Sequence, residues 1–299
     1  MDISVAILTF NGEEYLEKLI RAVRRQKTDL KYEILVIDSG SSDHTLEIIK
    51  KYEDVRLHQI PNSEFSHGKT RNLAANLAKG RFILFLTQDA VPAHEYWMES
   101  MIEPFKISDK VGCVIGKQIP HAHGPATIKR EVSIVFRGLG PDDSVSLQRK
   151  NKVTAHFNLI NTFLSDTNSA VRKDFMKEIP FRDVNYAEDQ AMGIDMLNAG
   201  YYKAYAPLGA VSHSHDYSVH EYFKRKFDEY VGLRNTTDYR ATAGFREITL
   251  GSIKATLRDW AFISRDKEYG FTLKIKNYFT SPLYNLALRL AIRAASKTQ

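Results

Sequence analysis

Cysteine is nearly absent from this sequence, since Cys113 is the only one in 299 residues. A single thiol excludes an intrachain disulfide framework and fits a reducing compartment. Long apolar runs are also missing, because no stretch approaches the roughly 20 residues that span a bilayer. The first residues lack the basic and apolar regions of a secretory signal peptide. We therefore expect a cytoplasmic protein without a membrane-spanning helix.

Acidic residues are scarce at the end of the chain. No Asp or Glu follows Glu268, and residues 240–299 hold 11 Lys or Arg against 4 Asp or Glu. The net charge of the whole chain is +6, so the residues before this tail are close to neutral. A basic tail indicates an anionic partner such as a membrane, a nucleic acid or a phosphorylated acceptor. A solvated helix face would explain the same charge.

The first third of the chain alternates between two periodicities. Apolar runs at residues 3–8, 33–37 and 82–87 predict buried strands, and stretches of helical periodicity separate them. Asn11 and Glu14 are in register for a capping box at the start of the first helix. Strands that alternate with helices predict a parallel, Rossmann-like sheet.

The later chain has a different texture. Gly, Pro, Asp and Ser clusters after about residue 120 predict loops and short elements. Residues 185–200 predict a helix, and the chain is mostly helical from residue 220. The sequence thus indicates one compact α/β unit followed by a helical extension.

Two acidic marks are the strongest candidates for chemistry. Asp89 ends the strand-like run at residues 81–89, and the pair Glu188 and Asp189 follows about a hundred residues later. Open α/β sheets bind ligands at the carboxyl ends of their strands. A second carboxylate facing Asp89 would suit a metal-bound phosphorylated substrate and a general base. The structural alternatives are a cap for a helix at residues 92–105 and favourable acids in a first helical turn.

Further polar residues are expected at the same edge of the sheet. Asp38 ends the second strand, where it could accept a hydrogen bond from a nucleobase imide or cap the next helix. Thr9 and Asn11 close the first strand. Arg71 could stack on a base or approach phosphates, or lie on the surface. From the residues alone, a capping role is favoured for Asp38.

The motifs occur together in a recognisable order over roughly residues 3–220. They are residues 6–11 (AILTFN), residues 36–43 (VIDSGSSD), Arg71-Asn72, residues 85–89 (FLTQD) and Glu188-Asp189. In this set the chain resembles family 2 glycosyltransferases of the GT-A fold. Residues 87–92 (TQDAVP) further resemble bacterial rhamnosyltransferases. The resemblance implies an α/β fold with a Rossmann-like, mostly parallel central sheet flanked by helices, and a helical C-terminal extension.

The resemblance also implies a domain organisation. Residues 1–220 would form the GT-A catalytic domain, with a nucleotide-sugar half at 1–115 and an acceptor half at 116–220. Residues 221–299 would form a basic, amphipathic extension.

Roles for individual residues follow from the resemblance. Asp189 would be the catalytic base, and Glu188 would bind and orient the acceptor. The expected donor-binding residues are Thr9, Asn11, Asp38, Arg71 and Gln88.

A divalent metal, Mg²⁺ or Mn²⁺, is expected on the donor diphosphate. The family pattern Asp-x-Asp reads Thr87-Gln88-Asp89 here, so only the second carboxylate is kept. Asp89 and His213 are the expected ligands, with His215 as the alternative histidine.

The expected activity is inverting transfer of L-rhamnose from dTDP-β-L-rhamnose to a saccharide or lipid-linked saccharide in cell-surface polysaccharide synthesis. A UDP-sugar-dependent enzyme of the same fold and a non-catalytic sugar-nucleotide-binding scaffold are the alternatives. A nucleotidyltransferase would need a Gly-rich basic loop after the first strand, which residues 9–13 do not form. Nucleic acid is not an expected partner, because the chain before its basic tail is close to neutral.

The tail combines an apolar stripe, including Leu283, Leu286 and Leu290, with the basic Arg289 and Arg293. This pattern predicts an interfacial helix, or a terminal helix docked on the body or on a second subunit. Peripheral contact with the inner face of the cell membrane and a homodimer are both open expectations.

Overall fold

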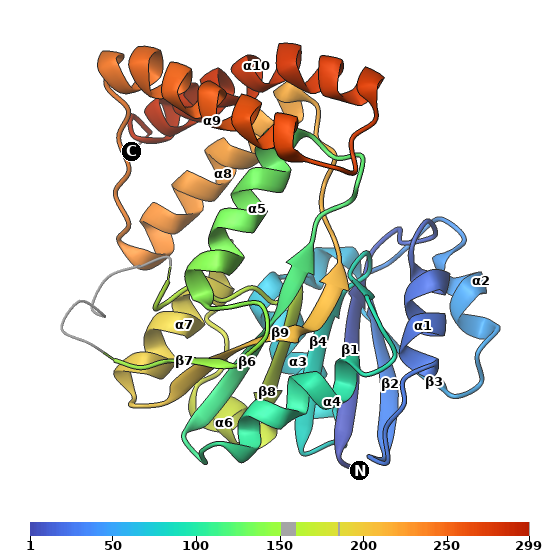
Figure 1. Ribbon diagram of the computed structural model, residues 1–299. Helices are drawn as coiled ribbons and strands as arrows, with labels where there is room; N and C mark the ends of the chain where they lie inside the picture. The colour runs from blue at the N-terminus through green and yellow to red at the C-terminus, as the bar shows by residue number, and fades with distance from the viewer. Residues whose placement is uncertain (151–159, 185, 299) are drawn as a thin grey trace. The chain divides into compact units, whose positions relative to one another are not determined.

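The computed structural model describes residues 1–150, 160–184 and 186–298 (Figure 1). The chain divides into two compact units. The first comprises Met1–Gln118 and Arg137–His213, and the second comprises Ile119–Phe136 and Ser214–Gln299. The sequence predicted a change after residue 220, whereas the second unit begins at Ser214 and also takes in residues 119–136.

The first unit is built on parallel strands at its N-terminal end. β1 (Ile3–Thr9) pairs in parallel with β2 (Tyr32–Asp38) and with β4 (Phe82–Thr87), and β2 pairs with β3 (Val55–Gln59). These strands occupy neighbouring positions in the blue and cyan part of Figure 1. The register sets Thr9 beside Asp38 and Leu8 beside Thr87. The strand ends that carry the candidate donor residues therefore meet at one edge.

The rest of the sheet is mixed. Among the described residues nine strands form one sheet in the order β3-β2-β1-β4-β8-β6-β9-β5, with β7 paired to β9. These later strands are β5 (Val91–Pro92), β6 (Val111–Ile119), β7 (Ser146–Gln148), β8 (Asn168–Arg172) and β9 (Tyr202–Ser212). β8 runs antiparallel to β4, with Asn168 opposite Leu86. The start of β8 consequently lies at the edge where β4 ends.

Helices cover both faces of the sheet. α1 (Leu16–Arg24), α2 (Thr45–Lys50) and α4 (Trp97–Ile102) share one apolar core with Leu84 and Leu86. The intervening Phe85 points the other way and packs against Phe181, with ring centroids 5.9 Å apart.

On that second face lie α3 (His67–Leu77), α6 (Lys173–Glu178) and α7 (Glu188–Asn198), which contact one another through α3. Short 3₁₀ turns at Asn62–Glu64 and Glu103–Lys106 complete the unit.

Two local predictions are wrong. Asn11 does not cap the first helix: α1 begins after Tyr15 without a side-chain cap, and Asn11 has a left-handed φ of 50°. The helix expected at residues 92–105 begins only at Trp97, because Val91 and Pro92 form β5. Asp89 is therefore not its cap. The helix expected at 185–200 is α7, and residue 185 lies outside the described residues.

The second unit is helical. Its elements are most of α5 (Ala126–Leu139), α8 (Val219–Thr237), the π-helix η3 (Glu247–Gly251), α9 (Ser252–Arg265) and α10 (Phe271–Ala295). The part of α5 that belongs to this unit ends at Phe136. Ile128 of α5 packs with Tyr222 and Tyr284 in one buried cluster. The amide nitrogen of Ala126 donates to Asn277 Oδ1 over 2.7 Å. These contacts explain why α5 belongs with the C-terminal helices. Within the described ranges, we find no helix with the length and apolarity required to cross a bilayer.

Candidate active site

The ends of β1 and β4 are joined by one amide side chain. Thr9 Oγ1 and the Phe10 amide nitrogen each donate to Gln88 Oε1 over 2.8 Å. Gln88 Nε2 donates back to the Phe10 carbonyl over 3.2 Å. These hydrogen bonds tie the residue after β4 to the end of β1. Thr9 and Gln88, both expected to bind the donor, therefore lie side by side.

Asp38 shapes the loop that follows β2. Its carboxylate is fully buried and accepts hydrogen bonds from Gly40 N at 3.0 Å, Ser41 N at 3.1 Å and Ser41 Oγ at 2.5 Å. Gly40 has φ = +82°, a conformation that favours glycine. The neighbouring Ser39 hydroxyl is buried and has no hydrogen-bond partner among the described residues. Asp38 therefore organises the loop, and a nucleobase contact by its carboxylate stays a prediction.

Asn11 joins two loops at this edge. Its side-chain Oδ1 accepts a hydrogen bond from Ser42 N over 2.9 Å, and its backbone nitrogen donates to Ser41 Oγ over 2.9 Å. The loops after β1 and β2 consequently behave as one surface. Thr9, Asn11, Asp38 and Gln88 are gathered here, whereas Arg71 is not hydrogen-bonded to any of them.

Asp89 lies against a histidine from the end of β9. Asp89 Oδ2 is 3.4 Å from His213 Nε2, and Asp89 Oδ1 accepts a hydrogen bond from Thr87 Oγ1 over 2.7 Å. The other ring nitrogen, His213 Nδ1, is 3.2 Å from Gln118 Oε1. Gln118 Nε2 in turn donates to Ser165 Oγ over 3.0 Å.

This arrangement fits a divalent metal ion. If His213 donates its Nδ1 hydrogen to Gln118, its Nε2 lone pair faces the carboxylate of Asp89, so two metal-ligating atoms converge. An imidazole held through its second nitrogen is the usual support for a metal-binding histidine. A mixed oxygen and imidazole set suits Mn²⁺ better than Mg²⁺. His215 follows two residues later and belongs to the second unit.

Arg71 lies between two buried carboxylates on the second face of the sheet. Its Nη1 is 2.8 Å from Glu188 Oε1, and its Nε is 3.2 Å from Asp166 Oδ2. Arg71 is only 6% exposed, so the surface location considered for it is wrong. Its Nη1 also donates to the carbonyl of His67 over 3.1 Å. The guanidinium therefore fixes the first residue of α7.

Two carboxylates contact this guanidinium, and the charge of Arg71 also acts on a third carboxyl group, that of Asp189. Partial burial, followed by the nearby charges of Glu188 and Asp166, raises the pKa of Asp189 well above 3.8. Burial raises the pKa of Asp166 to about 6, against the opposing effect of Arg71. A carboxylate that holds a proton more tightly than usual is a better general base once it is ionised.

Sequence reasoning missed Asp166. This residue is buried, accepts a hydrogen bond from Ser169 Oγ over 2.7 Å, and immediately follows Ser165, the partner of Gln118. The available signal was an acid two residues before the short strand at Asn168–Arg172, which is buried although three of its five residues are polar. That signal points to the sheet edge only if the strand is antiparallel to its neighbour, as β8 is to β4. Ser165 and Asp166 link the surroundings of Asp89 and Asp189.

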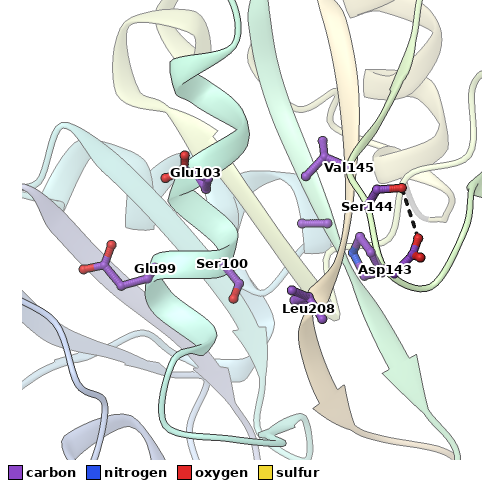
Figure 2. Close-up of a pocket in the computed structure, with 9 residues that line it drawn as sticks. Glu99, Ser100, Glu103, Asp143, Ser144, Val145 and Leu208 are labelled. Atoms are coloured by element: carbon purple, nitrogen blue, oxygen red, sulfur yellow. Dashed lines mark hydrogen bonds between the residues drawn. The ribbon is translucent and has the colours of Figure 1, made fainter.

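The first unit also has a cavity that involves none of these residues. It measures about 240 Å³ and lies between α4, β9 and the loop before β7. Figure 2 shows Glu99 of α4 and Glu103 of the following 3₁₀ turn on one side, with Leu208 of β9 and Val145 on the other. Its lining contains no predicted site residue, so we assign it no part in the reaction.

Comparison with known proteins identifies the class. The family model "Glycosyl transferase family 2" matches residues 4–179. The O-antigen chain rhamnosyltransferase RfbN of Salmonella typhimurium is 30% identical over 232 residues, which cover 76% of this chain and 71% of that protein. The O-antigen chain rhamnosyltransferase WbaN of Salmonella anatum is 31% identical, and the match covers 68% of this chain and 63% of that protein.

Solved structures show the same fold. The mannosyltransferase PcManGT from Pyrobaculum calidifontis, in complex with GDP-Man and Mn²⁺, aligns with a TM-score of 0.62 at 16% identity over 98% of this chain and 86% of that chain. Staphylococcus aureus TarS 1-349 in complex with UDP-GlcNAc aligns with a TM-score of 0.52 at 16% identity over 100% of this chain and 93% of that chain. The GT-A fold predicted from the sequence is confirmed.

The chain therefore belongs to glycosyl transferase family 2. It is a glycosyltransferase, and within the family it resembles bacterial rhamnosyltransferases.

Proposed function

We propose that this enzyme transfers L-rhamnose from dTDP-β-L-rhamnose, with inversion, to a saccharide or lipid-linked saccharide acceptor in cell-surface polysaccharide synthesis. The similarity to two O-antigen chain rhamnosyltransferases supports the sugar and the kind of product. The observation that carries the mechanism is Asp189, a carboxyl group with a raised pKa at the start of α7.

The chemistry is a single displacement. The acceptor hydroxyl oxygen forms a new bond to the anomeric carbon while the bond from that carbon to the diphosphate oxygen breaks. The leaving diphosphate keeps the bonding electron pair, and the carboxylate of Asp189 takes the hydroxyl proton. Glu188, held by Arg71 at 2.8 Å, orients the acceptor.

Asp89 and His213 would hold the divalent metal, which supplies positive charge beside the leaving diphosphate. Thr9, Asn11, Asp38 and Gln88 form the donor edge, where the loops after β1 and β2 are hydrogen-bonded together. For Arg71 we propose positioning of Glu188 and Asp166 in place of a direct donor contact, because both carboxylates occupy its guanidinium.

The test is a donor panel. Binding and turnover of dTDP-rhamnose, UDP-glucose, UDP-GlcNAc and GDP-mannose are measured with Mn²⁺, with Mg²⁺ and with EDTA. We expect selective, metal-dependent use of dTDP-rhamnose that is abolished in Asp89→Ala. Selective use of a UDP-sugar would retain the mechanism and replace the donor.

Two matched variants separate an enzyme from a binding scaffold. Asp189→Asn is expected to keep dTDP-rhamnose affinity within about twofold and to lose transfer by about 10²- to 10⁴-fold. Asp195→Asn, on the same helix but paired with Arg182, should transfer normally. If Asp189→Asn leaves transfer unchanged, Asp189 is not the base. Donor binding without turnover in any variant would favour the scaffold.

A further inference from the structure

The second unit carries an exposed apolar surface on two neighbouring helices. Trp260 Nε1 of α9 donates to the Tyr278 carbonyl of α10 over 3.0 Å, and Ser252 Oγ donates to the Asn285 carbonyl over 3.4 Å. These two bonds set α9 and α10 side by side and antiparallel, as Figure 1 shows.

Side chains on the outer side of this pair are large and apolar. We call this set the apolar face: Ile253, Leu257, Trp260, Phe279, Leu283 and Leu286. Members on each helix recur at intervals of three or four residues, so they form one stripe per helix. Phe279 is 77% exposed and Leu283 is 52% exposed. Large exposed apolar side chains that recur in this way on paired helices indicate an interaction site.

The exposed charges on α9 and α10 themselves have one sign. The exposed basic residues Lys254, Arg258 and Lys276, which we call the basic rim, lie on the same two helices. The only acidic residue within Ser252–Arg265 and Phe271–Ala295 is Asp259. Asp259 is buried and accepts hydrogen bonds from Thr127 Oγ1 at 2.7 Å and Asn285 Nδ2 at 2.6 Å.

The acids between the two helices are also engaged. Asp266 Oδ2 and Glu268 Oε2 each lie 2.9 Å from Lys129 Nζ, so their charge is directed toward α5. The described residues of α9 and α10 therefore offer exposed apolar side chains and exposed positive charge together, with no exposed acid within the two helices.

We propose that this outer side binds the surface of a membrane that contains anionic lipids. Its apolar face would enter the boundary between headgroups and acyl chains, and the basic rim would contact lipid phosphates. A second copy of the chain is a poorer partner. A two-fold contact through this face would bring the basic rims of the two copies together, and their like charges would repel. The inference depends on the second unit alone and is independent of the proposed donor.

The first measurement is co-sedimentation of the full chain with vesicles. Phosphatidylcholine vesicles are compared with vesicles that also contain phosphatidylglycerol, and sedimentation velocity without vesicles gives the oligomeric state. We expect a monomer that binds the anionic vesicles and detaches as the salt concentration rises. Equal binding to both vesicle types, or binding to neither, would overturn the proposal.

Two variants test the two parts of the surface. Phe279→Ser with Leu283→Ser is expected to lower partitioning onto anionic vesicles at least tenfold, by an order-of-magnitude estimate from the lost apolar area. The control Ile107→Ser removes an apolar side chain of similar exposure, 54%, from the first unit and should bind as the unmodified protein does. Circular dichroism verifies that each variant is folded.

The charge variant replaces the basic rim. Lys254→Gln, Arg258→Gln and Lys276→Gln together are expected to lower partitioning onto anionic vesicles about 100-fold. A dimer that the double serine variant dissociates, without vesicle binding by the unmodified protein, would assign the apolar face to a second copy and overturn the membrane proposal.

Discussion

Removing the guanidinium of Arg71 is the sharpest test of how the carboxyl groups of the candidate active site are held together. Arg71→Met keeps most of the side-chain volume and leaves Glu188, Asp166 and Asp189 without their shared cation. Breaking a buried ion pair by removing one partner costs about 3–5 kcal/mol in the free energy of unfolding. We expect a loss of that size at pH 8.

The loss should depend on pH with a definite sign. Asp166 has a folded pKa of about 6 even with Arg71 present, above its ordinary value of 3.8. Without the guanidinium this pKa and that of Asp189 rise further, because Arg71 lowers both. A carboxyl whose folded pKa exceeds its unfolded pKa destabilises the protein at high pH, and the effect fades as pH falls through the folded pKa. The variant should therefore recover much of its lost stability by pH 5.

Urea unfolding followed by tryptophan fluorescence can measure this loss of stability in the first unit, which contains Arg71. The chain has two tryptophans, and Trp97 is buried in the first unit, with its Nε1 donating to Asn168 Oδ1 over 3.0 Å. A Trp260→Phe background leaves Trp97 as the only reporter. The free energy of unfolding is then compared at pH 8 and pH 5.

A matched control removes an exposed ion pair of the same chemistry. Arg182 contacts Asp195 on α7, and their side chains are 46% and 29% exposed. Arg182→Met should cost less than about 1 kcal/mol. Equal losses in Arg71→Met and Arg182→Met, or a loss for Arg71→Met that does not change between pH 8 and pH 5, would refute the inference that Arg71 holds the buried carboxylates in place.

Three further outcomes follow from the site. The kcat/KM of transfer should fall on the acid side at a pH well above 4, because the raised pKa of Asp189 must be exceeded before it can accept a proton, and a limb near pH 4 would contradict this. Gln118→Leu should weaken Mn²⁺ binding, measured by electron paramagnetic resonance, about 10- to 100-fold by freeing the His213 ring, and unchanged affinity would exclude that support. Gly193→Ala should lower the free energy of unfolding in urea by about 1–3 kcal/mol, because the added Cβ would overlap the Thr162 carbonyl oxygen. Alanine favours helices, so a stabilised variant would show that the backbone moves to make room.

Local periodicity was enough to predict the first half of the sheet. β1, β2 and β4 are short apolar runs, and parallel strands carry their C-terminal residues to a common edge. This is why Thr9, Asp38 and Asp89 could be placed at one edge from the strand pattern, whereas Gln88 was expected there only from the resemblance to the family. The capping box at Asn11 failed because Asn11 bonds to the loop after β2, a partner 31 residues away. The spacing of residues within one helix start does not reveal a hydrogen bond to a loop that is distant in the sequence.

The sequence by itself determined the fold class, the family motifs and the acids at the ends of strands, because these depend on residues close in the chain. Only the tertiary structure decided that β8 runs antiparallel to β4, which brings Asp166 to the same edge, and that Arg71 is buried between Asp166 and Glu188. Strand direction and burial depend on contacts between distant residues. The pKa of Asp189 depends on both, since burial and the charges around it come from several elements that only folding assembles.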